Sequence, residues 1–106
     1  MQIALIKDLI VNEEYPSVIE ISTCQVLDLE GVTYKLTSDI IDSNASKCFE
    51  ITADNITLDC QGYEIDGVDK DGSYGIYSEN RTELEIKNCT ISDWAAGIYL
   101  SGTNNS

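Results

Sequence analysis

The chain has 106 residues, a length that fits one domain, and its 19 acidic and 6 basic residues give a net charge of −13. A surface of this charge repels nucleic-acid phosphates and anionic lipid head groups, so neither is an expected partner. The absence of histidine removes the commonest general acid–base group and the commonest metal ligand. Hydrophobic residues make up 42% and alternate with polar ones, which indicates a folded chain. No apolar run is long enough for membrane insertion.

The N-terminal segment carries isoleucines at helical spacing. Ile3, Ile6 and Ile10 would share one face of a short amphipathic helix, although isoleucine and valine also favour a strand. The apolar run is interrupted at Lys7, which makes it too short for the hydrophobic core of a secretory signal. We interpret residues 1–18 as an N-terminal cap or the remnant of an upstream region, so that the chain is either cytoplasmic or had an export signal upstream.

Residues 19–47 are predicted to form short lead-in strands. The expected strands cover Val18–Ser22, Val32–Leu36 and Ile40–Ile41. Gly31 marks a turn between the first two, and the polar segment Asp42–Lys47 is expected to be a loop.

From Cys48 onward the sequence repeats. The block CFEITADNITLDCQGYEIDG is followed by YGIYSENRTELEIKNCTISDW and then by AGIYLSGTNNS. Apolar positions align at offsets of 26 residues (84 − 58 and 91 − 65) and 22 residues (98 − 76), which pairs Leu58 with Leu84, Ile65 with Ile91, and Ile76 with Ile98. Periods of about 20 to 50 residues are typical of solenoids. Residues 48–106 are therefore predicted to form solenoid coils, of which the third is incomplete.

Each repeat consists of short segments in which apolar and polar residues alternate. Ile56, Leu58 and Cys60 alternate with polar residues, as do Leu84 and Ile86. This period of two fits strands with one buried face, and the asparagine, glycine and aspartate between them suit tight corners. The frame of a leucine-rich repeat is absent, and a propeller blade needs about 40 residues. The sequence thus predicts an all-β fold, a right-handed single-stranded parallel β-helix.

Three stretches resemble a known family. CFEITADNITLDCQGYEIDG looks like a first complete coil of the parallel β-helix repeat proteins, and GIYSENRTELEIKNCTISDWAAGIYLSGTNN looks like their standard coils. ISTCQVLDLEGVTYKLTSDI resembles their lead-in strand, so the resemblance covers Ile19–Ser106. This family resembles pectate lyases in fold, and it includes periplasmic copper-processing proteins and many archaeal surface proteins. Because its members usually carry many coils, the resemblance implies an N-terminal fragment of an extracellular, cell-surface or periplasmic protein.

The four cysteines contain no Cys-x-x-Cys pair that would indicate a zinc or thioredoxin-like site. Their even number fits disulfides in an oxidising compartment, but three pairings are conceivable and the sequence does not choose among them. Cys24 with Cys48 is the first pair to test, because it would tie the lead-in strand to the first coil. Cys60 has the parity of its buried neighbours and is expected to be a small core residue.

Three aromatic residues form the candidate binding site. Tyr77 and Tyr99 follow inward-facing isoleucines, so both should point outward and stack one coil apart, and Trp94 lies nearby in the sequence. Outward aromatic rings can bind the apolar faces of sugars. The alternative is a structural ladder that stiffens the sheet.

Acidic residues offer two further candidate sites. Asp66, Asp69 and Asp71 lie in a glycine-containing segment and supply the oxygen ligands that calcium prefers, although the closing glutamate of an EF-hand is absent. A plain polar loop is the alternative, and calcium is the one cofactor that the sequence suggests. At the 26-residue offset, Asp59 and Glu85 should stack about 4.8 Å apart. They would then bind a cation, act in acid catalysis, or form an ordinary solvated face.

Asparagines suggest a structural ladder and surface modification. Asn55 and Asn80 each follow an inward isoleucine by four residues and are predicted to form a hydrogen-bonded ladder at a corner. Asn-x-Ser/Thr sequons begin at Asn44, Asn55, Asn80 and Asn88. They are either glycosylation sites or matches that arise by chance in a chain rich in Asn, Ser and Thr.

These features together favour a non-catalytic, extracytoplasmic β-helix module that is structural or contacts carbohydrate, with polysaccharide or neighbouring β-helix coils as partners. The alternative is a fragment of a polysaccharide lyase or glycoside hydrolase whose catalytic coils lie beyond residue 106. The shortage of basic residues argues against a lyase base within this stretch, and the lack of histidine argues against copper ligands.

Overall fold

The computed structural model describes residues 17–102, which form eleven β-strands and no helix. The strands are β2 (Val18–Ile21), β3 (Gln25–Leu27), β4 (Thr33–Leu36), β5 (Ile40–Ser43), β6 (Lys47–Ile51), β7 (Thr57–Asp59), β8 (Glu64–Gly67), β9 (Tyr74–Glu79), β10 (Glu85–Lys87), β11 (Thr90–Ser92) and β12 (Ala96–Ser101). Every expected lead-in strand is present, whereas β3 was not expected. The helix or strand predicted around Ile6 lies outside the described residues.

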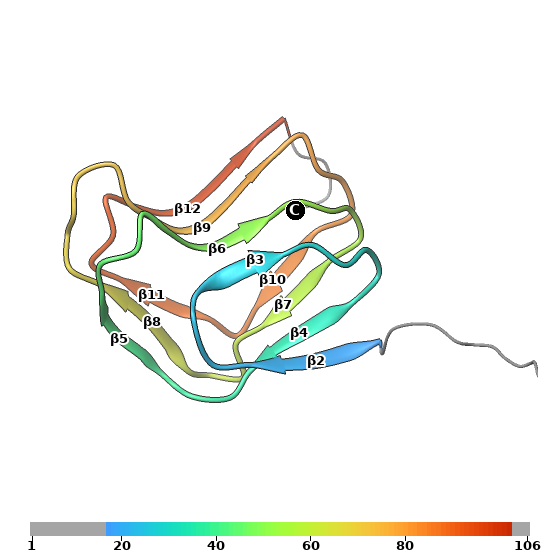
Figure 1. Ribbon diagram of the computed structural model, residues 1–106, viewed down its shortest axis with the longest axis horizontal. Helices are drawn as coiled ribbons and strands as arrows, with labels where there is room; N and C mark the ends of the chain where they lie inside the picture. Colours follow the sequence, from blue (N-terminus) through green and yellow to red (C-terminus); the bar gives the residue numbers. More distant parts are fainter. Residues whose placement is uncertain (1–16, 103–106) are drawn as a thin grey trace, which may run out of the picture.

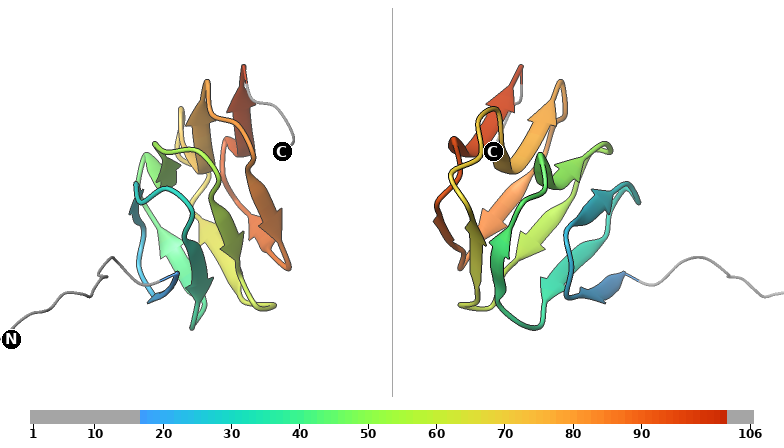
Figure 2. Two further views of the ribbon diagram at one scale, coloured as in Figure 1. Left: turned by 90° about the vertical axis from the view of Figure 1, so that its right-hand side faces the viewer. Right: turned by 60° about the vertical axis from the view of Figure 1, so that its left-hand side comes forward.

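The strands stack into three parallel sheets around one interior (Figure 1). The sheet orders are β10-β7-β4-β2, β11-β8-β5 and β12-β9-β6-β3. Consecutive strands from β4 onward fall in different sheets, so the chain makes three complete coils, preceded by a partial coil of β2 and β3. Figure 2 shows the coils lying side by side. The predicted all-β parallel β-helix is confirmed, and no part of residues 17–102 forms a helix that could cross a membrane.

The register between coils confirms two of the predicted alignments and corrects the third. Ile65 pairs with Ile91 and Ile76 pairs with Ile98, as the sequence offsets predict. Leu58, however, pairs with Ile86 and not with Leu84. A shift of two residues keeps every side chain on the same face, so the alternation of apolar residues cannot distinguish these two registers.

Branched and aromatic side chains fill the interior. Ile56, Leu58, Ile65 and Ile76 are each fully buried, in line with the inward positions that alternation predicts. Ile98 occupies the same register but is 48% exposed, because β12 pairs with a neighbour on only one side among the described residues. The wider core adds large side chains from other strands and corners, namely Leu27, Leu36, Phe49, Ile51 and Leu84.

Left-handed backbone turns the chain at the corners. Eight described non-glycine residues adopt positive φ: Asp42, Asn55, Gln61, Asp69, Asn80, Glu83, Asn88 and Asp93. Six of them are Asn or Asp, which tolerate this conformation better than other side chains do. At one corner the Gly31 amide donates to the Asn55 carbonyl at 3.0 Å, and the Asn55 amide donates to the Thr82 carbonyl at 2.9 Å. The corners therefore continue the hydrogen bonding from coil to coil.

Two disulfides join successive coils. Cys24 bonds to Cys48 and Cys60 bonds to Cys89, with Cα–Cα distances of 4.3 and 4.8 Å. Cys24–Cys48 is the pair that the sequence analysis selected first. Cys60–Cys89 was not predicted, although Cys60 is buried as predicted. Sequence separations of 24 and 29 residues correspond to about 3.5 kcal/mol of denatured-state entropy for each bond in the chain-entropy model.

Candidate functional site

The outer face of the β12-β9-β6-β3 sheet carries the candidate site. Alternation along β6 turns Phe49 and Ile51 into the core and leaves Glu50 outward. The same alternation in β9 buries Ile76 and turns Tyr77 outward. Because the strands are parallel and in register, equivalent outward residues form a row across the coils, which consists of Val26, Glu50, Tyr77 and Tyr99.

Three tyrosines meet on this face. The Tyr77 and Tyr99 rings are stacked, with centroids 5.0 Å apart and an interplanar angle of 7°. Tyr74 is tilted by 59° against both rings, at 4.9 Å from Tyr77 and 5.4 Å from Tyr99. The predicted outward stack of Tyr77 and Tyr99 is thus present, and Tyr74 completes an aromatic cluster that the sequence did not single out.

Lys47 lies over this cluster. Its register partner is Tyr74, and its Nζ stands 4.2 Å from the centroid of the Tyr77 ring. The same Nζ is 3.9 Å from Glu50 Oε2, and both side chains are more than a third exposed. An ammonium over an aromatic face beside a carboxylate is a cation–π arrangement. One face of the Tyr77 ring therefore meets Lys47 and the other meets Tyr99.

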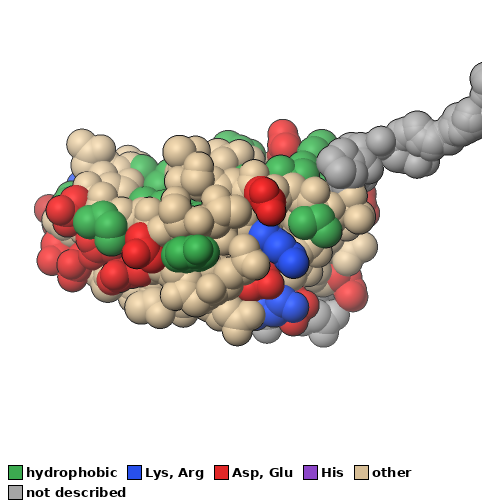
Figure 3. All heavy atoms as spheres, turned by 90° about the horizontal axis from the view of Figure 1, so that it is seen from below, with side chains coloured by type: hydrophobic (Ala, Val, Ile, Leu, Met, Phe, Trp, Pro, Cys, Tyr) green, Lys and Arg blue, Asp and Glu red, His purple; other side chains and the backbone are tan. Residues whose placement is uncertain are grey.

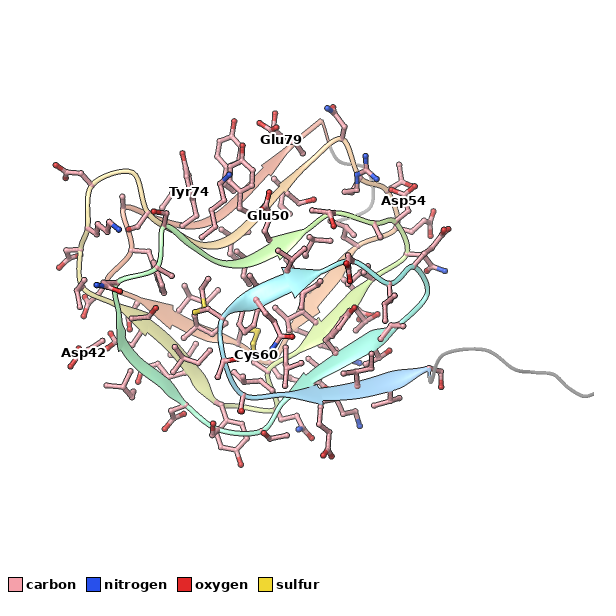
Figure 4. The ribbon with its side chains drawn as sticks, viewed as in Figure 1. Asp42, Glu50, Asp54, Cys60, Tyr74 and Glu79 are labelled. Atoms are coloured by element: carbon pink, nitrogen blue, oxygen red, sulfur yellow. A yellow bond between two sulfur atoms is a disulfide. The ribbon has the colours of Figure 1, made fainter. Side chains whose placement is uncertain are left out.

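Glu79 adds a second carboxylate on the same side. A hydrogen bond between Tyr77 and Glu79, with desolvation and the Glu79 charge, raises the pKa of Tyr77 to about 12. The phenol therefore remains a hydrogen-bond donor to a higher pH than an ordinary tyrosine does. Figure 4 shows Glu50, Tyr74 and Glu79 projecting from the outer side of the sheet, away from the interior where Cys60 lies. We call Tyr74, Tyr77, Tyr99, Lys47, Glu50 and Glu79 together the tyrosine face.

A small hollow of about 160 Å³ adjoins Tyr77 and is lined by Glu50, Ile51, Thr52, Tyr77, Glu79 and Arg81. Arg81 is held at its edge because Nη1 donates to the Thr52 carbonyl and Nε donates to the Glu79 carbonyl, each at 3.3 Å. Arg81 Nη1 also lies 3.9 Å from Asp54 Oδ1. The hollow thus has an aromatic wall, two carboxylates and a fixed guanidinium.

This combination matches the chemistry that holds sugars. Ring faces and edges of tyrosine contact the C–H faces of a pyranose, and carboxylates accept hydrogen bonds from its hydroxyls. Because both faces of Tyr77 are occupied, a ligand would use the outer face of Tyr99 and the ring edges.

No family model, curated protein or solved structure matches this chain. Functional interpretation therefore depends on the fold and on the geometry of the tyrosine face.

Trp94 does not join the tyrosines, contrary to the sequence prediction. Its side chain is buried, with 8% exposure, and its Nε1 donates to the Ile65 carbonyl at 3.0 Å. The indole fits there because two neighbouring residues lack side chains: a Cβ on Gly67 would lie 2.7 Å from the ring, and one on Gly75 would lie 3.2 Å from it. Trp94 is a core residue and has no ring face available to a ligand.

Asp66 is held by a local hydrogen-bond network. Its carboxylate accepts from the Asp42 amide and the Ser92 hydroxyl, both at 2.9 Å, and these bonds lower the pKa of Asp66. The pKa of Asp93 is raised, first by its hydrogen bond to Asp66 and then by the charge of Asp69. These acids lie at the end of the molecule that carries β5 and β8, where Figure 3 shows Asp and Glu gathered.

The predicted calcium trio is not assembled as a metal site. Asp66 makes its close contacts with residues outside the trio of Asp66, Asp69 and Asp71. Across residues 17–102, no three side chains of the His, Cys, Asp or Glu type are arranged to hold a metal ion.

The predicted stack of Asp59 on Glu85 is wrong. The register places Asp59 opposite Lys87, because the strands pair two residues away from the alignment that the sequence favoured. Asn88 Nδ2 donates to Asp59 at 3.1 Å and the Gln61 amide donates at 3.0 Å. These bonds, with a smaller contribution from Lys87, lower the pKa of Asp59. Asp59 is therefore a stably ionised surface group in a broad, open hollow near the second disulfide.

The predicted ladder from Asn55 to Asn80 is also not formed. The Asn55 amide bonds to Thr82 and the Asn80 amide bonds to Ser101, so the two asparagines do not occupy equivalent positions. Ile51 pairs with Ser78 and not with Ile76, so the positions four residues after Ile51 and after Ile76 are not equivalent. All four sequon asparagines (Asn44, Asn55, Asn80 and Asn88) are exposed, so glycosylation stays a prediction.

Four residues of the tyrosine face were not predicted from the sequence, namely Tyr74, Lys47, Glu50 and Glu79. A signal was present for Glu50 and Glu79, which share the outward parity of Tyr77 on β6 and β9. Lys47 and Tyr74 have the parity of the buried Phe49 and Ile76 and stand at the first position of their strands, so alternation gives no signal for them. Reading outward residues across coils, and not only inward ones, would have found Glu50 and Glu79. The Cys60–Cys89 bond was missed because the register around Leu58 was placed two residues away.

Proposed function

We propose that this chain is a non-catalytic β-solenoid module that contacts carbohydrate through the tyrosine face. The single observation that supports the proposal is the cluster of Tyr74, Tyr77 and Tyr99, which presents aromatic surface beside Glu50 and Glu79. Aromatic surface flanked by a few polar groups is the usual composition of a sugar-binding site.

We also propose an extracytoplasmic setting. Two disulfides within 106 residues support it, because disulfides persist in oxidising compartments and are rare in the cytosol. The resemblance of the coils to surface-associated and pectate-lyase-like repeat proteins is consistent with this setting, and kinship with that family is part of the proposal.

Binding to oligosaccharides tests the proposal. Hexamers of glucose, glucosamine and galacturonic acid would be titrated into the full chain and followed by calorimetry and by NMR of the tyrosine rings. Tyr99→Ala should weaken binding by about tenfold, because it removes the ring with the accessible outer face. The matched control is Tyr63→Ala: Tyr63 is likewise 37% exposed but lies between β7 and β8, off the tyrosine face.

Three outcomes would contradict the proposal. The first is failure of all three hexamers to bind at millimolar concentration. The second is an equal effect of Tyr99→Ala and Tyr63→Ala on the affinity. The third is turnover of pectin or alginate by the isolated chain, which would favour the lyase or hydrolase alternative. Thermal midpoints of both variants close to that of the parent chain would show that the comparison reports binding and not folding.

A further inference from the structure

The tyrosine face already holds an ammonium group of its own. Lys47 Nζ sits 4.2 Å above the Tyr77 ring and 3.9 Å from a Glu50 oxygen. An aromatic face together with a carboxylate is the chemistry that recognises cationic ligands. The Lys47 head group therefore marks a position that suits any primary ammonium of similar size.

The charges around this position favour a cation and disfavour an anion. Glu50 and Glu79 both lie on the face, and the chain as a whole carries a net charge of −13. The nearest cations are already engaged, Lys47 with Glu50 and Arg81 with Asp54 and two backbone carbonyls. A uronate would meet like charge on approach, whereas an amino sugar would meet opposite charge.

The Lys47 side chain can give way to a ligand. It is 38% exposed, and its contact with Glu50 is a single long ion pair, which contributes little to stability at the surface. Its flexible stem allows the ammonium to swing into solvent without disturbing the strand. Tyr77 and Glu50 would then be free to receive a cation from outside.

We propose that the tyrosine face selects glycans that carry a primary ammonium group, such as glucosamine oligosaccharides, over neutral and uronate glycans, and that Lys47 competes with the ligand ammonium for the position between Tyr77 and Glu50. This inference rests on the proposed carbohydrate contact and names its ligand class. The ligand ammonium takes the place of Lys47 Nζ, and the sugar rings lie along the edges of Tyr74 and Tyr99.

The test compares ligands that differ at one atom position. The glucosamine hexamer and cellohexaose, which is the glucose hexamer, share their backbone linkage. They differ only at C2 of each sugar, which carries an amine in the first and a hydroxyl in the second. Their affinities would be measured by calorimetry in mildly acidic, low-salt buffer for the parent chain and for Lys47→Met, Glu50→Gln and Lys35→Met. Methionine keeps the apolar stem without the charge. Lys35 lies on β4 in a different sheet, so Lys35→Met controls for net charge.

We expect the parent chain to bind the glucosamine hexamer about fivefold more tightly than cellohexaose, the range of one cation–π contact. Lys47→Met should raise the affinity for the glucosamine hexamer about fivefold beyond any gain from Lys35→Met. Glu50→Gln should lower that affinity and leave cellohexaose nearly unaffected.

Contrary outcomes separate this inference from the proposed function. Equal affinity for the two hexamers, with both weakened by Tyr99→Ala, would overturn the selectivity and leave the carbohydrate contact standing. Tighter binding of the galacturonic acid hexamer would do the same. Equal gains from Lys47→Met and Lys35→Met would overturn the competition by Lys47. If none of the hexamers binds, the proposed function itself fails and the inference fails with it.

Discussion

Ile76 and Ile98 provide a matched test of the solenoid core. The two isoleucines are register partners on adjacent coils, yet Ile76 is fully buried and Ile98 is 48% exposed. Replacing each with alanine removes the same atoms from equivalent backbone positions. Any difference in the free energy of unfolding therefore measures how completely the coils enclose the side chain.

The magnitudes follow from burial. Ile76→Ala loses a fully buried side chain and leaves a cavity between two coils, which should cost roughly 3 kcal/mol. Ile98→Ala loses about half of a transfer free energy of roughly 2 kcal/mol and leaves no enclosed cavity, so it should cost about 1 kcal/mol. At about 4 to 8 °C per kcal/mol for a domain of this size, the thermal midpoints should fall by roughly 12 to 24 °C and 4 to 8 °C.

Urea denaturation of the 106-residue chain measures both costs. The single tryptophan, Trp94, is buried and gives a fluorescence signal that changes on unfolding. The dependence of the free energy on urea should be equal in both variants and the parent, because the surface exposed on unfolding is nearly unchanged. Equal losses of stability, or a larger loss for Ile98→Ala, would refute the enclosed stack of coils.

Two contacts outside the tyrosine face, one at Gly67 and one at Asp59, can be tested by substitution. Gly67→Ala should destabilise the chain by about 2 to 3 kcal/mol, because the new Cβ would lie 2.5 Å from a backbone oxygen and 2.7 Å from Trp94; Gly97→Ala, whose nearest contact is 3.3 Å, should cost much less by the same urea assay. Asn88→Ala should raise the pKa of Asp59, followed by NMR of its carboxyl carbon, because the Asn88 amide donor holds that pKa below its ordinary value. The stability that this bond supplies is present above the pKa of Asp59 in the unfolded chain and is lost as the pH falls through its pKa in the folded chain. The free energies of unfolding of variant and parent should therefore converge in acid. An unchanged pKa of Asp59 in the variant would contradict the role of this bond.

Alternation along the chain was enough to predict most of the strands and their inward faces, although β3 was not expected. Ile56, Leu58, Ile65 and Ile76 are buried where a period of two places them. The offsets that pair Ile65 with Ile91 and Ile76 with Ile98 also hold. These features depend on local sequence and on one repeated requirement, namely that each coil buries one face against the common interior.

The register at β7 and β10 could not be fixed in this way. Leu84 lies in the corner before β10 and is buried, as Ile56 is before β7. Each segment thus carries two inward apolar residues two positions apart, at 56 and 58 in one and at 84 and 86 in the other. The segments can therefore be aligned in either of two registers that differ by two residues. The register predicted from the sequence put Asp59 beside Glu85, whereas Asp59 lies opposite Lys87. The same error hid the pairing of Cys60 with Cys89.

The orientation of Trp94 could not be predicted from its position in the sequence. An aromatic residue at a corner turns inward only if the neighbouring coil leaves space for the ring. Gly67 supplies that space from a coil 27 residues earlier in the chain (94 − 67). The tyrosines differ because Tyr77 and Tyr99 lie within strands, where the parity of Ile76 and Ile98 determines their direction.

Disulfide mapping is the most direct test of how the coils are stacked. Digestion of the non-reduced chain after Lys, Arg and Glu separates the four cysteines into residues 21–30, 48–50, 51–64 and 88–106. Mass spectrometry should find residues 21–30 linked to 48–50 and residues 51–64 linked to 88–106, because Cys24–Cys48 and Cys60–Cys89 each join successive coils. Recovery of residues 21–30 linked to 51–64 or to 88–106 would contradict the coil register on which the core and the tyrosine face both depend.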